Sequence, residues 1–300
     1  ILPGSANLFG GRGVTIKNVP SRTVQGMKFP SAPHGLKMAC GENPKRVYGS
    51  RKTAPSTRMG NVAGYRAEWL KAVEYRDRWR NYDPEGEKPA PSRDLRMETL
   101  VGVLDGEIIV HNHCYRADEM ATLIEVSKEF GYKIGTFHHA VESYKIADLL
   151  AQEEICSAMW ADWWGFKLEA FDGILQNIAL VENAGACAIV HSDSARDIQR
   201  LNQEASKARS AGIRMGIDIS KEDAIGWITL NAAKSLGIEK VTGSLEPGKA
   251  ADLVIWSRDP FSVYSKAEKV FIDGYLYFDR MTGKKPVTDF ALEQLVEVGP

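Results

Sequence analysis

The feature that most constrains the fold is a regular alternation of apolar runs and helical stretches between residues 97 and 236. The expected helices cover residues 97–104, 117–130, 143–153, 169–183, 195–211 and 221–236, and the expected strands cover 107–111, 132–137, 155–160 and 187–191. Apolar strands that alternate with helices are typical of a parallel sheet covered by helices. Because no GxGxxG or Walker turn follows an early strand, the pattern favours an α/β fold of the (β/α)8 TIM-barrel type over a doubly wound sheet.

Upstream of this region the pattern is less regular. Residues 14–19 and 36–40 are expected to form two more strands, since both runs are apolar and bounded by turn residues. Between residues 61 and 82, large apolar residues such as Trp69 and Trp79 recur near helical spacing among many charges. This spacing predicts an amphipathic helix.

The last part of the chain has a different residue pattern from the rest. From Gly243 onward, turn residues separate short runs that are rich in β-branched and aromatic residues. Such runs indicate strands and hairpins. We therefore divide the chain into a barrel over residues 1–240 and a small β module with a C-terminal tail over residues 241–300.

The charges are nearly balanced, with 38 Lys and Arg against 39 Asp and Glu. No basic stripe or polybasic run indicates a nucleic-acid or anionic-membrane partner. The longest apolar runs, such as residues 185–190, are far shorter than the roughly 20 residues of a membrane-spanning helix. We expect a small-molecule substrate and neither a nucleic acid nor a membrane as partner, and a homo-oligomer stays open.

The four cysteines are Cys40, Cys114, Cys156 and Cys187. Each stands alone in an apolar or mixed segment, and no CxxC pair occurs. A chain of this size does not need the disulfides of a small secreted scaffold, so we expect four reduced, buried thiols. The compartment stays open between the cytoplasm and the periplasm or the cell exterior.

Histidines gather where the expected strands end, which is where a barrel places its catalytic groups. The positions are His111 and His113, then His138 and His139, then His191 with Asp193. Imidazole and carboxylate groups at one mouth suit Zn²⁺ or a similar divalent ion. Because side chains alternate along a strand, His138 and His139 are not expected to point into the barrel together, whereas His111 and His113 share a face.

Four segments together resemble the amidohydrolase superfamily, specifically its imidazolonepropionase-like branch. They are Val110–Glu119, Phe137–Ala140, Ile189–Asp193 and the Gly-Ser-Leu-Glu-Pro-Gly-Lys-Ala-Ala-Asp-Leu-Val run that begins at Gly243. The last run is the most specific, because in that family it marks the return from the barrel to a β-sandwich built from both chain ends. The resemblance implies hydrolysis of an amide-type C–N bond, with one or two divalent ions, zinc first among them.

Carried over by position, the resemblance makes His113 the strand-five metal ligand and His139 the strand-six ligand. Asp193 becomes the strand-eight aspartate, which binds metal, acts as general base on the metal-bound water and then protonates the leaving amine. For strand four two candidates stay open. Lys37 resembles a lysine that is carboxylated to bridge two metals, and Glu42 resembles the glutamate that replaces it in other members.

The sequence departs from the family pattern near its start. The His-X-His pair of strand one does not occur ahead of Lys37. We therefore expect strands one and two and half of the β-sandwich to lie upstream of Ile1, so that the barrel is partial and this piece alone binds metal poorly.

Loops at the mouth of a barrel shape substrate choice. The candidate substrate-binding residues are Arg116, Trp163, Trp164 and Lys167. The aromatic pair suits an apolar portion of a substrate and the cations suit a carboxylate, while loop packing and solvated charge are the alternative for each.

Two rival functions stay open. One is hydrolytic deamination of a heterocycle, for which the family's His-x-x-Glu arrangement is absent after His113, although His139 and Glu142 have that spacing on the next strand. The other is a metal-free scaffold, which would have no need for His113, His139 and Asp193 together.

Overall fold

The computed structural model describes residues 1–163 and 165–282. Its larger sheet has the strand order β1-β2-β3-β4-β5-β6. The strands are β1 (Phe9–Gly13), β2 (His34–Ala39), β3 (Ile108–Cys114), β4 (Ile134–His139), β5 (Cys156–Met159) and β6 (Ala188–Val190). Strands β2 to β6 are parallel, and β1 pairs with β2 in the antiparallel direction. The α/β class and the parallel sheet are thus confirmed, and β1 and β6 form the two edges of the sheet within the described residues.

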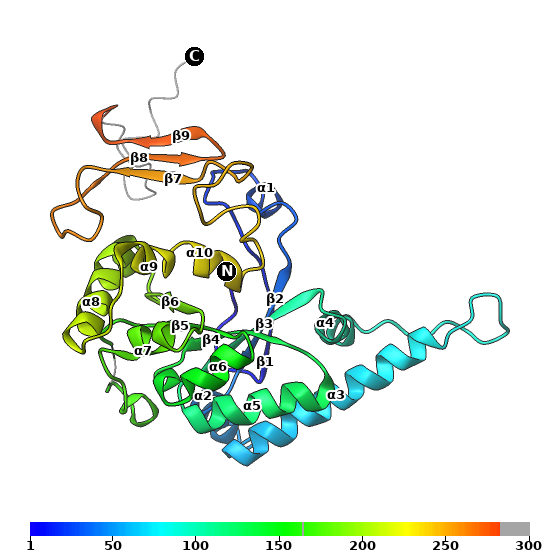
Figure 1. The fold of residues 1–300 in the computed structure, drawn as a ribbon. Coiled ribbons are helices and arrows are strands. Elements are labelled where there is room, and N and C mark those ends of the chain that lie inside the picture. Colours follow the sequence, from blue (N-terminus) through cyan, green and yellow to red (C-terminus); the bar gives the residue numbers. More distant parts are fainter. Residues whose placement is uncertain (164, 283–300) are drawn as a thin grey trace.

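Most of the expected helices are present. The structure has the helices α1 (Val24–Met27), α2 (Glu42–Ser50), α3 (Arg58–Arg80), α4 (Leu95–Leu104), α5 (Ala117–Phe130), α6 (Ala147–Gln152), α7 (Asn177–Asn183), α8 (Leu201–Arg214), α9 (Lys221–Gly226) and α10 (Leu230–Ser235), with short 3-10 turns η1 (Ser143–Ile146), η2 (Leu168–Ala170), η3 (Asp197–Arg200) and η4 (Arg280–Thr282). Of these, α1, α2 and η4 were not expected from the sequence. Helices α5 to α8 follow one another around the outer side of the curved sheet (Figure 1). No helix in the described part of the chain is both long and apolar enough to cross a bilayer.

Two expected helices are interrupted. The run 169–183 is helical only in η2 and α7, and the run 221–236 divides into α9 and α10. At the second break, the fully buried Trp227 accepts a hydrogen bond on its carbonyl oxygen from the Val190 N–H. That carbonyl pairs with the end of β6, so tertiary pairing overrides local helix propensity.

The strand expected at residues 14–19 is wrong. Ile16 forms only an isolated bridge with Lys28, and the strand that pairs with β2 lies earlier, at Phe9–Gly13. The glycines of β1 fit because β2 passes close by: a Cβ on Gly10 would lie 3.2 Å from the Gly4 oxygen and 3.4 Å from the Lys37 side chain. Close backbone approach, not β propensity, selects this strand.

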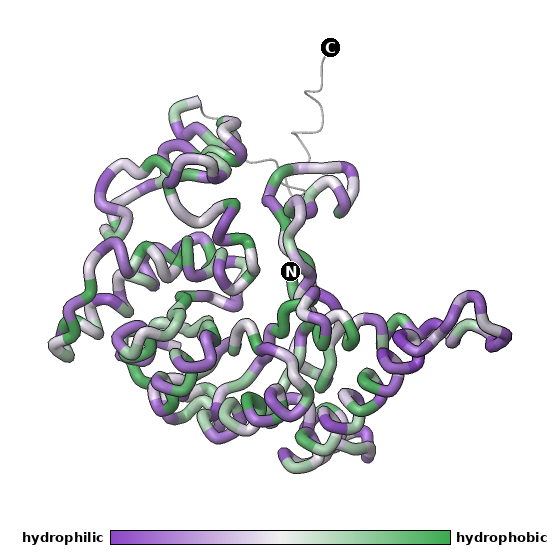
Figure 2. The backbone as a smooth tube through the Cα atoms, turned by 45° about the vertical axis from the view of Figure 1, so that its right-hand side comes forward, coloured by the Kyte–Doolittle hydropathy of each residue, from purple (hydrophilic) through white to green (hydrophobic). Residues whose placement is uncertain are grey.

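The main core lies between the sheet and the helices outside it. Trp69 on α3 is fully buried, and its ring centroid lies 4.4 Å from that of Tyr132. Phe9 of β1 meets Trp69 edge to face at 5.4 Å. The aromatic packing thus fastens α3 to β1 and to the start of β4. By contrast, the turn that projects between α3 and α4 is mostly hydrophilic (Figure 2).

A second sheet of order β7-β8-β9 follows the last helix, and all its strands are antiparallel. Its strands are β7 (Leu253–Trp256), β8 (Ala267–Ile272) and β9 (Tyr275–Asp279), which confirms the expected β module. The Lys17 ammonium forms an ion pair with Asp273 and lies 3.7 Å from Asp252, so the N-terminal segment contacts this sheet. The division at residue 240 remains a prediction.

The expectation of four reduced cysteines is wrong. Disulfides join Cys40 to Cys114 and Cys156 to Cys187. Strand pairing brings the two Cα atoms of each pair to 5.2 Å and 4.4 Å, distances that a disulfide can bridge. The partners are 74 and 31 residues apart in sequence, so their spacing does not reveal the pairing.

Candidate active site

Strand register gathers five of the six histidines at one end of the larger sheet. Lys37 of β2 pairs with His111 of β3, and His113 pairs with His138 of β4. A hydrogen bond of 3.0 Å joins His111 Nδ1 to His138 Nε2. The remaining histidine, His34, begins β2 and bonds to Gly13 and Lys28.

His139 breaks the alternation of side chains along β4. Its φ is +72° and that of Ala140 is +41°, so the backbone turns out of the strand at this point. The His139 ring therefore lies 4.7 Å from the His113 ring, stacked between Tyr115 at 5.3 Å and Trp160 at 4.7 Å. The alternation rule predicted that one ring of the pair would face the site. The structure brings both rings into the histidine cluster.

Asp193 ends the segment after β6, also with a positive φ of +52°. Its carboxylate is half exposed, and Oδ2 lies 3.9 Å from His139 Nδ1. Burial raises the pKa of Asp193, and the charge of Lys37 opposes that rise. His191, two residues earlier, stacks on Trp160 at 5.3 Å.

The histidines of the cluster are neutral. Burial, reinforced by the charge of Lys37, lowers the pKa of His111 to about 4 and that of His191 to about 3. Burial holds the pKa values of His113 and His139 well below the ordinary value, reinforced by the charge of Lys37 for His113 and by the neighbouring histidines, His191 first, for His139. Neutral imidazole is the form that binds a metal ion.

The two strand-four candidates lie in different surroundings. Lys37 is 6% exposed and forms no ion pair within the described residues. Burial lowers its pKa to about 8, although the charge of Asp193 opposes this. Glu42 begins α2, and its backbone N–H donates to Glu169. The charge of Lys37 contributes to lowering the pKa of His139, whereas the charge of Glu42 adds to the rise that burial causes in the pKa of Tyr115.

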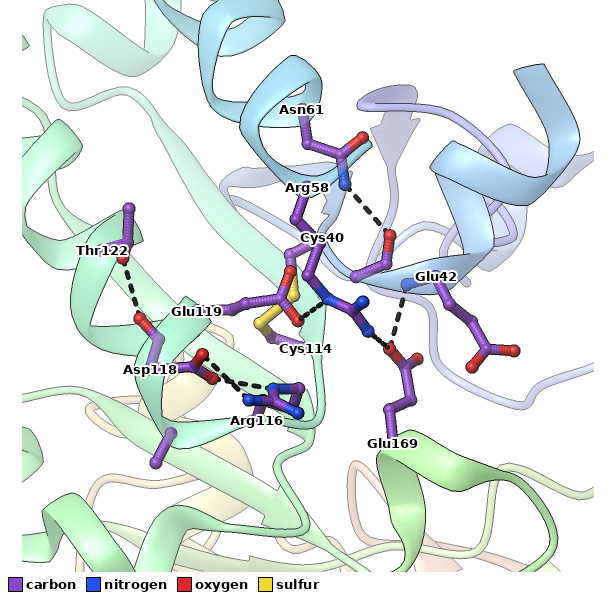
Figure 3. A network of polar contacts seen from close by, with 12 residues as sticks. Cys40, Glu42, Arg58, Asn61, Cys114, Arg116, Asp118, Glu119, Thr122 and Glu169 are labelled. Carbon is purple, nitrogen blue, oxygen red and sulfur yellow. Dashed lines mark hydrogen bonds and ion pairs between the residues drawn. A yellow bond between two sulfur atoms is a disulfide. The ribbon is translucent and has the colours of Figure 1, made fainter. Parts of the chain in front are cut away.

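The predicted substrate residues are spread around the mouth. Trp163 is half exposed and stacks on Phe166 at 4.9 Å. Lys167 lies 4.0 Å above the Tyr115 ring. Arg116 forms a two-pronged ion pair with Asp118 at 2.9 Å and 3.1 Å (Figure 3). Trp164 lies outside the described residues.

Sequence reasoning missed the residues that hold this mouth in place. Glu169 has a side chain only 2% exposed and accepts hydrogen bonds from the Glu42 N–H, Arg58 Nη2 and Lys167 Nζ. Figure 3 shows Arg58 between Glu169 and Glu119 of α5. One signal lay in Gly41, where a Cβ would come within 2.7 Å of the Glu169 carboxylate.

The donor atoms of the cluster fit a divalent ion. Among the described residues, His113 Nδ1, His139 Nδ1 and His191 Nε2 are buried without a hydrogen-bond partner, and ligation would satisfy such nitrogens. Tetrahedral zinc ligands lie about 3.4 Å apart, close to the 3.9 Å between His139 and Asp193. Within residues 1–163 and 165–282, however, no three His, Cys, Asp or Glu side chains converge as a ready-made metal site. The residues fit a divalent ion in type and in their neutral charge, and they supply neighbouring side chains but not a complete coordination sphere.

The Glu142 carboxylate is not free to take the role of the glutamate in the deaminases' His-x-x-Glu arrangement. Its carboxylate accepts a hydrogen bond of 2.9 Å from the Ala117 N–H at the start of α5 and lies 3.3 Å from Lys145. The side chain is therefore used to hold α5, which leaves the His139–Glu142 spacing without a free carboxylate.

Comparison with known proteins agrees with this geometry. The profile of the Amidohydrolase family (Amidohydro_3) matches residues 142–277. Amidohydrolase tasK of Hapsidospora irregularis is 32% identical over 302 residues, which cover 93% of this chain and 30% of tasK. The imidazolonepropionase of Picrophilus torridus is 40% identical over 75 residues, covering 25% of this chain and 18% of that enzyme. The matched parts thus span under a third of the length of these curated relatives.

A solved structure extends the similarity to the fold. The amidohydrolase from Thermotoga maritima MSB8 superposes with a TM-score of 0.84 at 38% identity, over 93% of this chain and 71% of that one. Together with the profile and the curated relatives, this likeness covers the sheet, the histidine cluster and the C-terminal strands. The chain belongs to the amidohydrolase superfamily, and its shorter matches to imidazolonepropionases agree with the branch that the sequence resembles.

Proposed function

We propose that this chain carries the larger part of a metal-dependent site that hydrolyses an amide-type C–N bond of a small molecule. The observation that carries the proposal is the group of His113, His139 and Asp193. Two buried neutral imidazoles with unpartnered nitrogens adjoin a half-exposed carboxylate, and one of them lies 3.9 Å from it. This is the set of groups that the reaction requires.

In the proposed mechanism, His113, His139 and Asp193 hold the ion. A divalent ion at this place would lower the pKa of a water molecule and polarise the carbonyl group of the substrate. Asp193 moves the proton. Its carboxylate would take up the proton of the attacking water and pass it to the leaving amine.

Lys37 is proposed as the fourth ligand. An ammonium group buried without a carboxylate partner is unfavourable, so this position favours a modification that removes the positive charge. Carboxylation would do so and would place an anionic oxygen ligand beside His111. Glu42, engaged through its backbone with Glu169, is the weaker candidate.

For the substrate, Trp163 and Lys167 supply the two kinds of contact that the mouth offers. Trp163 and Phe166 form a half-exposed apolar surface. Among the described residues, Lys167 donates to Asn43 and Glu169, which leaves its third N–H donor for a substrate carboxylate. A small amide or dipeptide with an apolar portion and a carboxylate suits these contacts.

The test is metal analysis of the full-length gene product and of this chain, for the wild type and for the variants His113→Ala and Asp193→Ala. His34→Ala is the matched control, because this histidine lies outside the cluster. We expect bound zinc or another divalent ion in the wild type and in the control, and its loss in the two variants. A metal-replete full-length protein without bound ion would overturn the proposal.

The products separate amide hydrolysis from deamination. A panel of small amides and dipeptides should yield a new carboxylate and an amine, whereas amino-substituted heterocycles should release no ammonia. Release of ammonia from a heterocycle, with no amide cleaved, would favour the rival reaction.

A further inference from the structure

A chain of hydrogen bonds leads from the buried Glu169 to the ring of His113. Lys167 Nζ donates to Glu169 Oε1 at 2.9 Å and to Asn43 Oδ1 at 3.2 Å. On its other side, the Asn43 amide nitrogen lies 3.2 Å from His113 Nε2 and 2.8 Å from Ser5 Oγ. Asn43 therefore stands between an ammonium group and an imidazole.

The ammonium group fixes the direction of these bonds. A lysine ammonium has donors and no acceptor, so the Asn43 atom that faces Lys167 must be the carbonyl oxygen. The Asn43 NH2 group then faces His113, and Nε2 of the ring must accept. A neutral imidazole that accepts at Nε2 carries its proton on Nδ1.

The position of Lys167 is itself fixed. Glu169 is held by Arg58 at 3.0 Å and by the Glu42 N–H at 2.9 Å, and its side chain is 2% exposed. Lys167 also lies 4.0 Å above the Tyr115 ring, where a cation is stabilised by the ring face. The ammonium group is thus held against Asn43 from two sides.

We infer that Asn43 and Lys167 are positioning residues that hold His113 as the Nδ1–H tautomer and thereby weaken metal binding through Nδ1. Ligation at Nδ1 requires the proton to move to Nε2, which then needs an acceptor. The Asn43 amide would have to turn over, and its NH2 group would meet the ammonium group of Lys167. This inference rests on the proposed function only in assigning His113 to the metal.

The buried Nδ1 atom of His113 agrees with this assignment. It has no hydrogen-bond partner among the residues that the structure describes. In the tautomer that Asn43 imposes, this buried atom is an N–H donor, and the centroid of its ring lies 4.7 Å from that of the His139 ring. The proton that this tautomer places on Nδ1 occupies the position that a metal ion would take.

Asn43→Asp reverses the arrangement with almost no change in shape. One carboxylate oxygen still accepts from Lys167, and the other now accepts from a His113 Nε2–H, so Nδ1 gains a free lone pair. Asn7→Asp is the matched control, since Asn7 is exposed and accepts from the Tyr48 hydroxyl. A second variant, Lys167→Met, removes the ammonium group and leaves the Asn43 amide free to take both orientations.

The measurement is the tautomer of His113 in the metal-free full-length protein, read from the nitrogen shifts of ¹⁵N-labelled histidine, with His113→Gln for assignment. We expect Nδ1–H in the wild type and in Asn7→Asp, Nε2–H in Asn43→Asp, and a mixture in Lys167→Met. Zinc titration of the same proteins should show at least about tenfold tighter binding for Asn43→Asp, the size of effect typical of groups that orient a metal ligand.

An Nε2–H tautomer in the wild type, or an unchanged tautomer in both Asn43→Asp and Lys167→Met, would overturn the inference. Reversal of the tautomer without tighter zinc binding would overturn the claim that this tautomer weakens metal binding. Because the tautomer is read without metal or substrate, its reversal would stand even if the full-length protein proved to be no hydrolase. The two failures are therefore distinguishable.

Discussion

Asp193 Oδ2 lies 3.9 Å from His139 Nδ1, and both residues have a positive φ, +52° and +72°. For a residue with a side chain, such a backbone conformation costs about 1–3 kcal/mol and persists only where the surroundings impose it. The two strained positions lie at the same end of the sheet, after β6 and at the end of β4, with β5 between these strands. Backbone strain at both is what brings carboxylate and imidazole together.

Asp193→Asn should lower kcat/KM of the full-length enzyme on a cleaved amide by about 10²–10⁴-fold, because the amide side chain cannot take up and return a proton. The melting temperature should change little, since Asp193 is half exposed and forms no close ion pair. Steady-state kinetics and a thermal melt check both parts. Asp162→Asn, on an exposed aspartate paired with Lys207, is the control. Full activity in Asp193→Asn would remove this residue from the mechanism.

Replacing both Cys40 and Cys114 with alanine should lower the free energy of unfolding by about 4 kcal/mol, since the disulfide closes a loop of 74 residues. Urea denaturation without reductant measures the difference. Thiol titration of the unfolded, unreduced wild type should detect no free thiol. Four free thiols in that titration would show that neither disulfide forms.

The periodic parts of the fold could be predicted from the sequence. Helix α5 was expected at residues 117–130 and has those bounds, because its apolar side recurs at helical spacing and Gly131 ends it with a φ of +74°. The parallel strands that end in histidine were also predicted, because their apolar sequence pattern matches their burial in the sheet. The position of His113, His139 and Asp193 at the same end of the sheet followed from the strand order.

What depends on distant partners could not be predicted. The turn of His139 out of its strand rests on a backbone angle that no local pattern signals. Glu169 looked like an ordinary helical residue, yet it is held by Glu42 and Arg58, more than 100 positions away in sequence. The pairing of Cys40 with Cys114 required the strand register to be known.

The ion pairs of Arg58 and of Arg116 in Figure 3 should contribute unequally to stability. Arg58→Met leaves the buried carboxylate of Glu169 and the partly buried one of Glu119 without their shared cation and should lower the free energy of unfolding by about 3 kcal/mol. Arg116→Met breaks only an exposed pair with Asp118 and should cost less than about 1 kcal/mol. Urea denaturation of both variants tests the contrast. Equal losses would mean that burial of Glu169 does not govern the strength of its pair.

Glu182 should make stability depend on pH in a direction opposite to that of most carboxylates. Burial raises the pKa of Glu182, although the hydrogen bond of 2.9 Å from the Trp227 indole N–H opposes the rise. Above the ordinary pKa of a glutamate the folded state therefore binds more protons than the unfolded state, so the free energy of unfolding falls as pH rises until the folded pKa is passed.

Glu182→Gln, which resembles the protonated side chain and can still accept from Trp227, should remove that fall. The difference in unfolding free energy between Glu182→Gln and the wild type should thus shift in favour of the variant as the pH rises from 4.5 to neutrality. This range begins near the ordinary glutamate pKa of about 4.3 and extends upward because the pKa of Glu182 is raised in the fold. Urea denaturation across this range measures it. Glu87→Gln, at an exposed position, should show no such shift. A shift in favour of the wild type would mean that the Trp227 bond outweighs burial and that the pKa of Glu182 is lowered.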